Sequence, residues 1–360
     1  MKKQRKEPQL EEIVRNFDKL KIAVIGDFCL DLLFHGKHKG FSRESAAPIN
    51  RIAEQIGYPG AAANVVYNLA KLGVGKVIPI SVIGTDSQSI VKSGDLLLKF
   101  FEEAGIDCTN ILRSDKRQTY TYMKFMATGE GTSTPEQQFY RADVGRDDEL
   151  DHASENQIIK ILEDLSYKDL DAIIISDYSK GIIGPKIFNQ ARKLREKNIL
   201  VIGNARKDIS RLRELDLIVQ NDYEVVSAYE EINGEKRGGD LQIERCAKRL
   251  LNDTKSEYLI VTRGELGMTV FENCLRYGYS ITKVSTKPKK VVDVTGAGDT
   301  TLAAITAASC SFRKLTGYLS HVRPAEIGNY AGGIVVQKLG TATASQEELI
   351  KEIESDEQLS

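Results

Sequence analysis

The sequence contains no tryptophan and few prolines (8), cysteines (5) or histidines (4). The cysteines are odd in number, widely separated and never arranged as C-x-x-C, which argues against a disulfide framework and against a zinc site. No apolar run reaches the length of a membrane span, and the basic N-terminus lacks the apolar segment of a signal peptide. We therefore expect a cytoplasmic protein without a membrane partner.

The chain also lacks an excess of charge of either sign, because 50 lysines and arginines nearly cancel 51 aspartates and glutamates. This balance removes the electrostatic reason to expect binding to nucleic acid, so small molecules are the expected partners. With 360 residues, 41% of them hydrophobic, the chain is long enough for one large α/β domain or two smaller ones.

Short β-branched apolar runs alternate with helical patterns along most of the chain. The runs are residues 21–27, 76–84, 171–177, 199–203, 215–221 and 257–264. Helical patterns such as 61–73 and 184–198 lie between them. This alternation predicts a mostly parallel sheet with helices on both faces, whose ligands bind beyond the carboxyl ends of the strands.

Two regions, residues 32–57 and 117–143, interrupt this alternation with aromatic and β-branched residues and no intervening helix. We predict antiparallel ribbons there, added to the main sheet as a small β lid. A lid would exclude water from reacting phosphates. The exposed edges of its strands also predict a homodimer formed through the lid.

The segment DVTGAGD, residues 293–299, places two glycines just before an aspartate and an apolar helical stretch. We predict a strand that ends near Val292 and a helix that begins at Gly296 to Gly298, where unpaired N–H groups and the helix dipole would bind an anion. Asp299 is then either a capping carboxylate or a general base beside a transferring phosphoryl group. The segment is neither a Walker P-loop nor a G-x-G-x-x-G fingerprint.

Seven segments share their order and spacing with the ribokinase-like (PfkB) sugar kinases, which the chain resembles over about residues 20–350. They are GDFCLDLL, PGAAANVVYNLAKLG, SDYSKG, QNDYE, TRGELG, DVTGAGDT and GNYAGGIVVQKLGTATAS. The segments SDYSKG, FSRESAAPINRI, QQFYRAD and the closing IVVQKLGTATAS more narrowly resemble the D-glycero-D-manno-heptose 7-phosphate kinase domain. The resemblance implies a three-layer α/β/α domain over 21–350, a tail or short helix at 1–20 and a tail at 351–360.

The same resemblance implies which residues bind the sugar and its phosphate. Carboxylates and amides would contact the hydroxyls, and cations would pair with a phosphate on the substrate. The implied sugar-binding residues are Asp27, Asp31, Gly60, Asn64, Lys124, Asp177 and Lys180. The candidate partners of a substrate phosphate are Arg43, Lys124, Arg141, Lys180 and Arg206, of which we favour Lys180.

The resemblance further implies ATP and Mg²⁺ as cofactors and leaves a monovalent cation open. Asn221 and Glu224 would organise Mg²⁺, with Glu224 acting through water, because oxygen ligands and retained waters suit this ion. The residues expected to bind ATP are Thr262, Gly264, Gly267 and Asn329, of which Asn329 is equally well explained as a helix cap. The residues expected to carry catalysis are Gly296, Ala297, Gly298 and Asp299.

Four departures from the family pattern leave the substrate open. GNARK at 203–207 lacks a carboxylate usual there, Ala61 replaces a glycine, Gln220 replaces a proline and Met126 replaces an arginine. No His-x-Gly-His motif marks the nucleotidylyltransferase domain to which many such kinases are fused. We expect a kinase that makes a sugar 1-phosphate. A kinase for another sugar or a nucleoside, and a binding protein without turnover, stay as alternatives.

Overall fold

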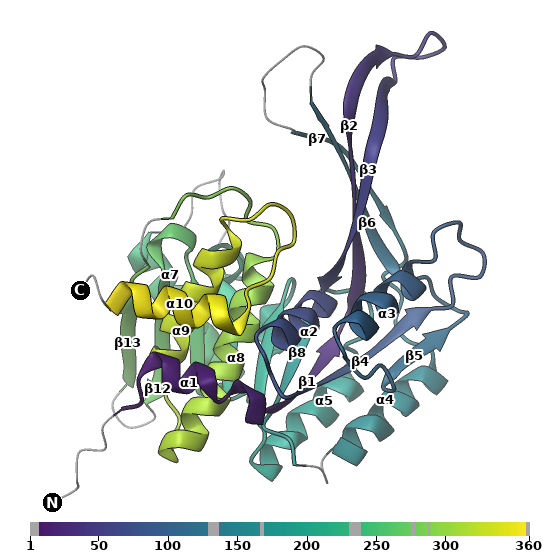
Figure 1. Ribbon diagram of the computed structural model, residues 1–360. Helices are drawn as coiled ribbons and strands as arrows, with labels where there is room; N and C mark the ends of the chain where they lie inside the picture. Colours follow the sequence, from purple (N-terminus) through teal and green to yellow (C-terminus); the bar gives the residue numbers. More distant parts are fainter. Residues whose placement is uncertain are drawn as a thin grey trace, which may run out of the picture.

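The computed structural model describes residues 7–128, 137–165, 169–229, 239–274, 278–286 and 289–357. One large sheet passes through the body of the molecule (Figure 1). Its strands are β1 (Lys21–Gly26), β4 (Lys76–Gly84), β5 (Ile111–Ser114), β8 (Ala172–Asp177), β9 (Leu200–Ala205), β10 (Leu217–Asn221), β11 (Tyr258–Thr262), β12 (Met268–Cys274) and β13 (Gly278–Val284).

The nine strands follow the order β13-β12-β11-β10-β9-β8-β1-β4-β5. Neighbours from β11 to β5 are parallel, whereas β12 and β13 add an antiparallel edge. The six predicted core strands are all present, with ends within two residues of the prediction. They are buried on both faces. In β1, Ile22 and Val24 belong to one core cluster while Ala23 and Ile25 belong to the other, as the period of two requires.

Helices cover both faces of this sheet, which confirms the three-layer architecture. The helices that contribute to the first core cluster are α1 (Leu10–Arg15), α2 (Ala62–Lys71), α3 (Ser93–Glu103), α8 (Ala297–Thr316), α9 (Val322–Val335) and α10 (Gln346–Glu357). Those that contribute to the second are α4 (His152–Leu165), α5 (Pro185–Lys193), α6 (Asp222–Ser227) and α7 (Asp240–Thr254). Short 3₁₀ helices η1 (Phe17–Lys19), η2 (Leu194–Lys197), η3 (Ile209–Arg211) and η4 (Gly264–Leu266) punctuate the connections.

Both ends of the described chain are packed against the body. Helix α1 buries Leu10 and Ile13 and lies beside α10. Residues 351–357, expected to belong to a tail, instead form the second half of α10, where Ile353 is fully buried. Ile353 faces the core and Lys351 and Glu354 are exposed, which is the amphipathic pattern of a surface helix, and Asp356 accepts the hydroxyl of Tyr330 at 2.9 Å. Among the described residues, no helix is both long and apolar enough to cross a bilayer.

A separate four-stranded sheet forms the lid and projects well beyond the body (Figure 1). Its strands are β2 (Phe28–Phe41), β3 (Pro48–Ala61), β6 (Tyr120–Thr128) and β7 (Gln137–Val144). The order is β3-β2-β6-β7, and the outer pairs are antiparallel as predicted. The central pair, β2 with β6, is parallel, which corrects the expectation of purely antiparallel ribbons added to the main sheet. Part of the predicted lid, 129–136, lies outside the described residues.

Candidate active site

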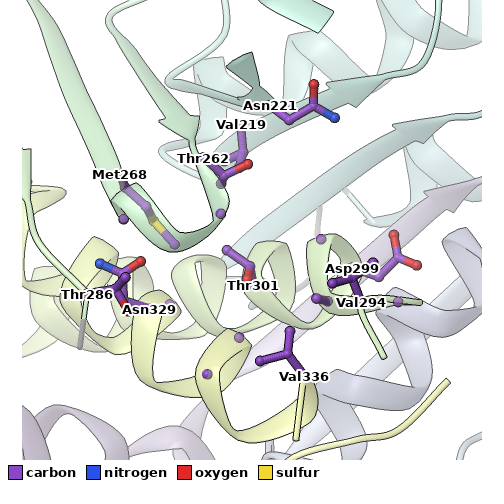
Figure 2. A pocket seen from close by; sticks show the side chains of 18 of the residues that line it. Val219, Asn221, Thr262, Met268, Thr286, Val294, Asp299, Thr301, Asn329 and Val336 are labelled. Atoms are coloured by element: carbon purple, nitrogen blue, oxygen red, sulfur yellow. The ribbon is translucent and has the colours of Figure 1, made fainter. Parts of the chain in front are cut away.

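A cavity of about 890 Å³ opens beyond the carboxyl ends of β10 and β11 and is closed from below by α8 and α9. Figure 2 shows Met268, Thr286 and Asn329 at one end of it and Asn221 and Asp299 at the other. All ten residues predicted for catalysis and nucleotide binding line this cavity. They are Asn221, Glu224, Thr262, Gly264, Gly267, Gly296, Ala297, Gly298, Asp299 and Asn329.

Helix α8 begins where the sequence predicted, at Ala297, with Gly296 as its N-cap in the left-handed region at φ 78°. A Cβ at Gly296 would lie 2.8 Å from Nδ2 of Asn64, so glycine is needed for the approach of α2 as well as for the turn. At Gly298 a Cβ would meet nothing within 4 Å, because this position faces open space. The N–H of Ala297 donates to the carbonyl oxygen of Val294 at 3.2 Å, so an anion at this helix start would have to bind the neighbouring amides.

The strand expected to end near Val292 is absent, because residues 289–296 form an irregular segment. The amides of Val292 and Asp293 both donate to the carbonyl oxygen of Val336 at the end of α9, at 2.7 and 3.2 Å. The apolar pattern of this segment is explained by the cavity instead. Val291 and Val294 line the cavity and are more than half exposed.

Asp299 lies in the first turn of α8 and accepts two side-chain hydrogen bonds. Tyr178 donates its hydroxyl to Oδ1 at 2.5 Å, and Asn64 donates Nδ2 to Oδ2 at 2.9 Å. Burial raises the pKa of Asp299, and these two donors together with the charge of Arg206 oppose the rise. The carboxylate is therefore a hydrogen-bond acceptor at the mouth of a helix, which is a position that suits a general base.

A buried polar network fixes the orientation of Asn64. Asn68 donates Nδ2 to Oδ1 of Asn64 at 2.9 Å, and Thr300 donates its hydroxyl to Oδ1 of Asn68 at 2.8 Å. Because the Oδ1 of Asn64 is an acceptor in this network, its Nδ2 must face Asp299. Asn64, which was predicted to contact the sugar, therefore also holds the candidate base.

Asn221 and Glu224 form a reciprocal capping box at the start of α6. The Oδ1 of Asn221 accepts the N–H of Glu224 at 2.7 Å, and Oε2 of Glu224 accepts the N–H of Asn221 at 3.0 Å. The other carboxylate oxygen of Glu224 pairs with Arg206 at 3.2 Å. Burial raises the pKa of Glu224, and the Asn221 N–H and Arg206 oppose the rise. The motif is a helix start whose oxygens line the cavity.

The predicted nucleotide-binding positions shape the far end of the cavity. Gly267 has a φ of 78°, and a Cβ there would lie 2.2 Å from the carbonyl oxygen of Val284. Asn329 donates Nδ2 to the carbonyl oxygens of Val284 and Ser285 at 3.3 Å each, so it holds the chain beside the cavity rather than capping a helix. Thr262 donates to the carbonyl oxygen of Gln220 at 3.5 Å.

None of the seven residues predicted to bind the sugar lines this cavity. Three of them meet at the base of the lid instead. Asp31 on β2 pairs with Lys124 on β6, with Oδ2 and Nζ 3.2 Å apart, and a Cβ at Gly60 would lie 3.0 Å from Oδ1 of Asp31. Asp31 is close enough to Asp299 to raise the pKa of that carboxyl by repulsion. The cavity and the cluster of Asp31, Lys124 and Gly60 at the base of the lid therefore both lie near Asp299.

Asp27 and Asp177 are buried and already have partners. Asp27 is 1% exposed, and its carboxylate accepts backbone N–H groups from Tyr178, Lys180 and Ile182 at 2.7, 3.1 and 3.1 Å. Asp177 accepts the N–H of Ser179 at 2.8 Å and pairs with Arg211 at 3.1 Å. The structure thus gives both carboxylates a role in shaping the loop after β8, in place of an open surface for sugar hydroxyls.

The other candidate phosphate partners lie on different parts of the molecule. Lys180 pairs with Asp147 at 3.0 Å and lies over the ring of Tyr120 at 4.0 Å. Arg141 pairs with Asp143 on β7, whereas Arg43 is at the far turn of the lid hairpin. Arg206 alone of the five lines the cavity.

Two departures from the family pattern contact each other. Asn204, within GNARK, donates Nδ2 to Oε1 of Gln220 at 3.0 Å and to the carbonyl oxygen of Val219 at 2.7 Å. Gln220 in turn donates to the carbonyl oxygen of Ala205 at 2.9 Å. An amide pair between β9 and β10 therefore stands where a carboxylate and a proline are usual. Ala61, the third departure, is strained at φ 52°.

Sequence reasoning missed Tyr178 as a contact of Asp299 and placed Arg206 only among five candidates. Tyr178 lies within SDYSKG, but 121 residues separate it from Asp299, so no local spacing reveals the contact. Lys289, which lines the cavity and pairs with Glu352 of α10, was also missed.

Comparisons with known proteins agree with this architecture. Bifunctional protein HldE of Pseudomonas paraeruginosa is 30% identical over 345 residues, which cover 95% of this chain and 65% of that protein. Bifunctional protein HldE of Marinomonas sp. is 32% identical, over 93% of this chain and 64% of its own length. The chain thus spans about 65% of the length of these relatives.

Solved structures show the same fold at lower identity. Phosphofructokinase-2 from Escherichia coli in complex with substrates and products has a TM-score of 0.70 at 16% identity, covering 93% of this chain and 99% of that one. Arabidopsis thaliana ribokinase complexed with ribose and ATP has a TM-score of 0.67 at 16% identity, covering 93% and 98%. Residues 19–348 match the pfkB family of carbohydrate kinases, and the chain therefore belongs to that family.

Proposed function

We propose that the chain transfers the γ-phosphoryl group of ATP to O1 of D-glycero-D-manno-heptose 7-phosphate, giving the 1,7-bisphosphate. The observation that carries this proposal is the position of Asp299, at the mouth of α8 and between the cavity and the base of the lid. The similarity to HldE proteins over 95% of the chain supports the narrower choice of substrate.

In this reaction Asp299 accepts the proton of the attacking hydroxyl while the oxygen of that hydroxyl forms a bond to Pγ. The bond between Pγ and the β,γ-bridging oxygen breaks, and its electron pair leaves with ADP. The amides at the start of α8 stabilise the charge on the phosphoryl oxygens. A base of this kind contributes about 10²- to 10⁴-fold to the rate.

Magnesium would neutralise phosphate charge in this site. Asn221 and Glu224 offer oxygen donors on the wall of the cavity, which fits a hard cation. Their capping bonds and the pair with Arg206 already engage these oxygens, so binding through retained waters is the arrangement that suits them. The lid-side cations, with Lys180 first, would pair with the 7-phosphate.

A substrate panel tests the proposal. The purified chain is incubated with MgATP and, separately, heptose 7-phosphate, fructose phosphates, ribose and adenosine, and ADP release is followed with the Asp299→Asn variant as background. We expect the heptose phosphate to give the highest kcat/KM and a product with an anomeric phosphate by ³¹P NMR. Preference for an unphosphorylated acceptor would refute the heptose assignment. Parallel assays in potassium and choline chloride test a monovalent cation.

A kinase for another sugar or a nucleoside is the second candidate, favoured by the Asn204–Gln220 pair in place of the usual carboxylate and proline. A sugar- or nucleotide-binding protein without turnover is the third. Binding without ADP release across the whole panel would favour the third candidate, and release with a different acceptor the second.

We also propose a homodimer formed through the lid, in the cytoplasm. Among the strands that the structure describes, β3 and β7 lie at the edges of the lid sheet, and Phe41, Ile49 and Tyr140 of the lid are 67%, 46% and 57% exposed. The five free thiols suit a reducing compartment. Sedimentation equilibrium should give twice the mass of one chain, and a monomer at assay concentrations would contradict the dimer.

A further inference from the structure

A series of contacts runs from the candidate base, Asp299, through Tyr178 and Arg206 to Glu224 in the capping box of α6. Asp299 accepts the hydroxyl of Tyr178 at 2.5 Å, and the guanidinium carbon of Arg206 lies 5.0 Å from the centroid of the Tyr178 ring. Arg206 then pairs with Glu224 at 3.2 Å. All four residues line the same cavity.

Backbone hydrogen bonds fix the positions of Tyr178 and Arg206, the two middle residues of this series. The N–H of Tyr178 donates to the buried carboxylate of Asp27 at 2.7 Å, so the loop that carries Tyr178 is tied to the end of β1. The N–H of Arg206 donates to the carbonyl oxygen of Asp177 at 2.9 Å and extends the pairing of β8 and β9 by one bond. Both side chains therefore leave rigid strand ends.

Arg206 is the cation that the geometry brings to the mouth of α8. Its side chain is 52% exposed although it pairs with Glu224 and stacks on Tyr178. The hydrogen bond to Glu224 uses Nη1, one of several donor groups on the planar guanidinium, so other N–H groups can face an anion in the cavity. An anion on the first turn of α8 would lie beside this side chain.

We propose that Arg206 is a catalytic residue that binds the transferring phosphoryl group, and that Tyr178 is a positioning residue that fixes Asp299. This inference rests on the proposed phosphoryl transfer. It assigns Arg206 to the nucleotide side of the reaction, not to a phosphate already on the sugar. Tyr178 can only donate to a carboxylate, so it both orients Asp299 and stabilises the ionised form that accepts the proton.

The groups that face Asp299 come from four other segments. They are Tyr178 after β8, Asn64 of α2, Arg206 after β9 and Asp31 of β2, and Glu224 of α6 is close enough to feel its charge. Removal of the Tyr178 hydroxyl leaves Asn64 and Arg206 as the favourable partners. The ionised form then loses one donor, so the carboxylate becomes harder to deprotonate.

Nucleotide affinity tests Arg206 without reference to the sugar. Calorimetry with excess Mg²⁺ compares AMP-PNP, which has a γ-phosphoryl group, with ADP, which does not. For Arg206→Gln we expect the affinity for AMP-PNP to fall about 10- to 100-fold while that for ADP stays within about twofold, because one charge-assisted contact is lost. Arg206→Lys, which keeps the charge, should recover part of the loss.

Equal losses for both nucleotides, or no loss for either, would overturn the assignment. So would unchanged AMP-PNP affinity combined with a raised KM for a phosphorylated acceptor, which would place Arg206 at the acceptor's phosphate. Because binding of AMP-PNP requires no acceptor, these results stand even if every substrate in the panel fails, so the two proposals can fail separately. Thermal melts identify any variant that does not fold.

Tyr178→Phe tests the positioning role with the best acceptor found. We expect kcat to fall about tenfold with little change in the KM for ATP, and the acid limb of the kcat/KM profile to move to higher pH. Tyr318→Phe is the matched control, since Tyr318 packs on Phe312 away from the cavity. If Tyr178→Phe keeps a normal kcat and an unmoved acid limb, the hydrogen bond from Tyr178 to Asp299 has no role in catalysis.

Discussion

Asn64 donates Nδ2 to Oδ2 of Asp299 at 2.9 Å and thereby joins helices α2 and α8 across 235 positions of sequence. The contact brings the segment expected to meet the sugar against the residue expected to act as base. It also explains why glycine is required at 296, where a Cβ would lie 2.8 Å from the same Nδ2. Asp299, the side-chain amide of Asn64 and the turn at Gly296 therefore pack together and depend on one another for their positions.

Asp299→Asn removes the base and keeps the shape of the side chain. Turnover should fall by about 10²- to 10⁴-fold, because an amide accepts no proton from the attacking hydroxyl. ATP binding should persist, since the amide retains an acceptor oxygen. Steady-state kinetics and calorimetry check both parts, and near-normal turnover would remove Asp299 from the mechanism.

Gly298→Ala tests the anion site at the start of α8. A Cβ here meets nothing within 4 Å, so folding should be unaffected or improved, by up to about 1 kcal/mol. Turnover should nevertheless fall about tenfold or more, because the methyl group occupies the space in which the phosphoryl oxygens approach the backbone.

Gly239→Ala provides the matched control for that variant. Gly239 precedes α7, and a Cβ there also meets nothing within 4 Å. In this control, steady-state kinetics should show normal turnover, and urea unfolding should show that the protein folds as stably as the Gly298→Ala variant. Equal turnover in the two variants would mean that the backbone at Gly298 does not contact the reacting group.

Ala61→Gly should stabilise the protein. Ala61 precedes α2 at φ 52° and ψ −134°, a region that residues with a Cβ adopt only under strain. Relief of that strain, less the added freedom of the unfolded chain, should raise the free energy of unfolding by about 1 kcal/mol. Ala63→Gly, within α2, should lower it by about 1 kcal/mol. Urea melts that show both variants equally destabilised would contradict the strain at Ala61.

His321 should make stability depend on pH. It is 1% exposed, contacts Ser309 at 2.9 Å through Nδ1, and its Nε2 has no partner among the described atoms. Burial lowers its pKa from 6.5 to about 3. The unfolded chain therefore takes up a proton below pH 6.5 that the folded chain does not, and this part of the stability is lost as the pH falls from 6.5 toward 3.

Between pH 7 and pH 5 the wild type should lose about 2 kcal/mol more than His321→Gln, which lacks this group. Urea unfolding at the two pH values measures the difference, and the remaining histidines cancel because both proteins carry them. Parallel pH dependence in the two proteins would show that His321 is accessible to protons in the folded state.

The parts of the fold that could be predicted are those encoded by local patterns. The strand expected at 76–84 is present at Lys76–Gly84, and the helix expected after Gly296 begins at Ala297. Each is specified by its own periodicity and by the glycine that ends or starts it. Asn221 and Thr262, the last residues of β10 and β11, were expected at a ligand site only from the family resemblance, and both line the cavity.

The features that were missed depend on contacts between distant segments. The parallel pairing of β2 with β6 places Leu33 beside Lys124, and no local turn sequence predicts a pairing between strands so far apart in the chain. Asp27 was expected to face the sugar, but three backbone amides about 150 residues away occupy its carboxylate. The alternation around Val292 resembled a strand because a cavity wall and a sheet face both require apolar side chains.

Only Asp27 separates β1, in the middle of the large sheet, from β2, the long inner strand of the lid. The buried carboxylate at this junction is held by the loop that carries Tyr178. A strand of 14 residues is about 45 Å long, so a rotation of about 5° at this junction displaces Phe41 by about 4 Å. A very small rotation at Asp27, beside the base, would therefore become a displacement of several ångströms at the far tip of the lid.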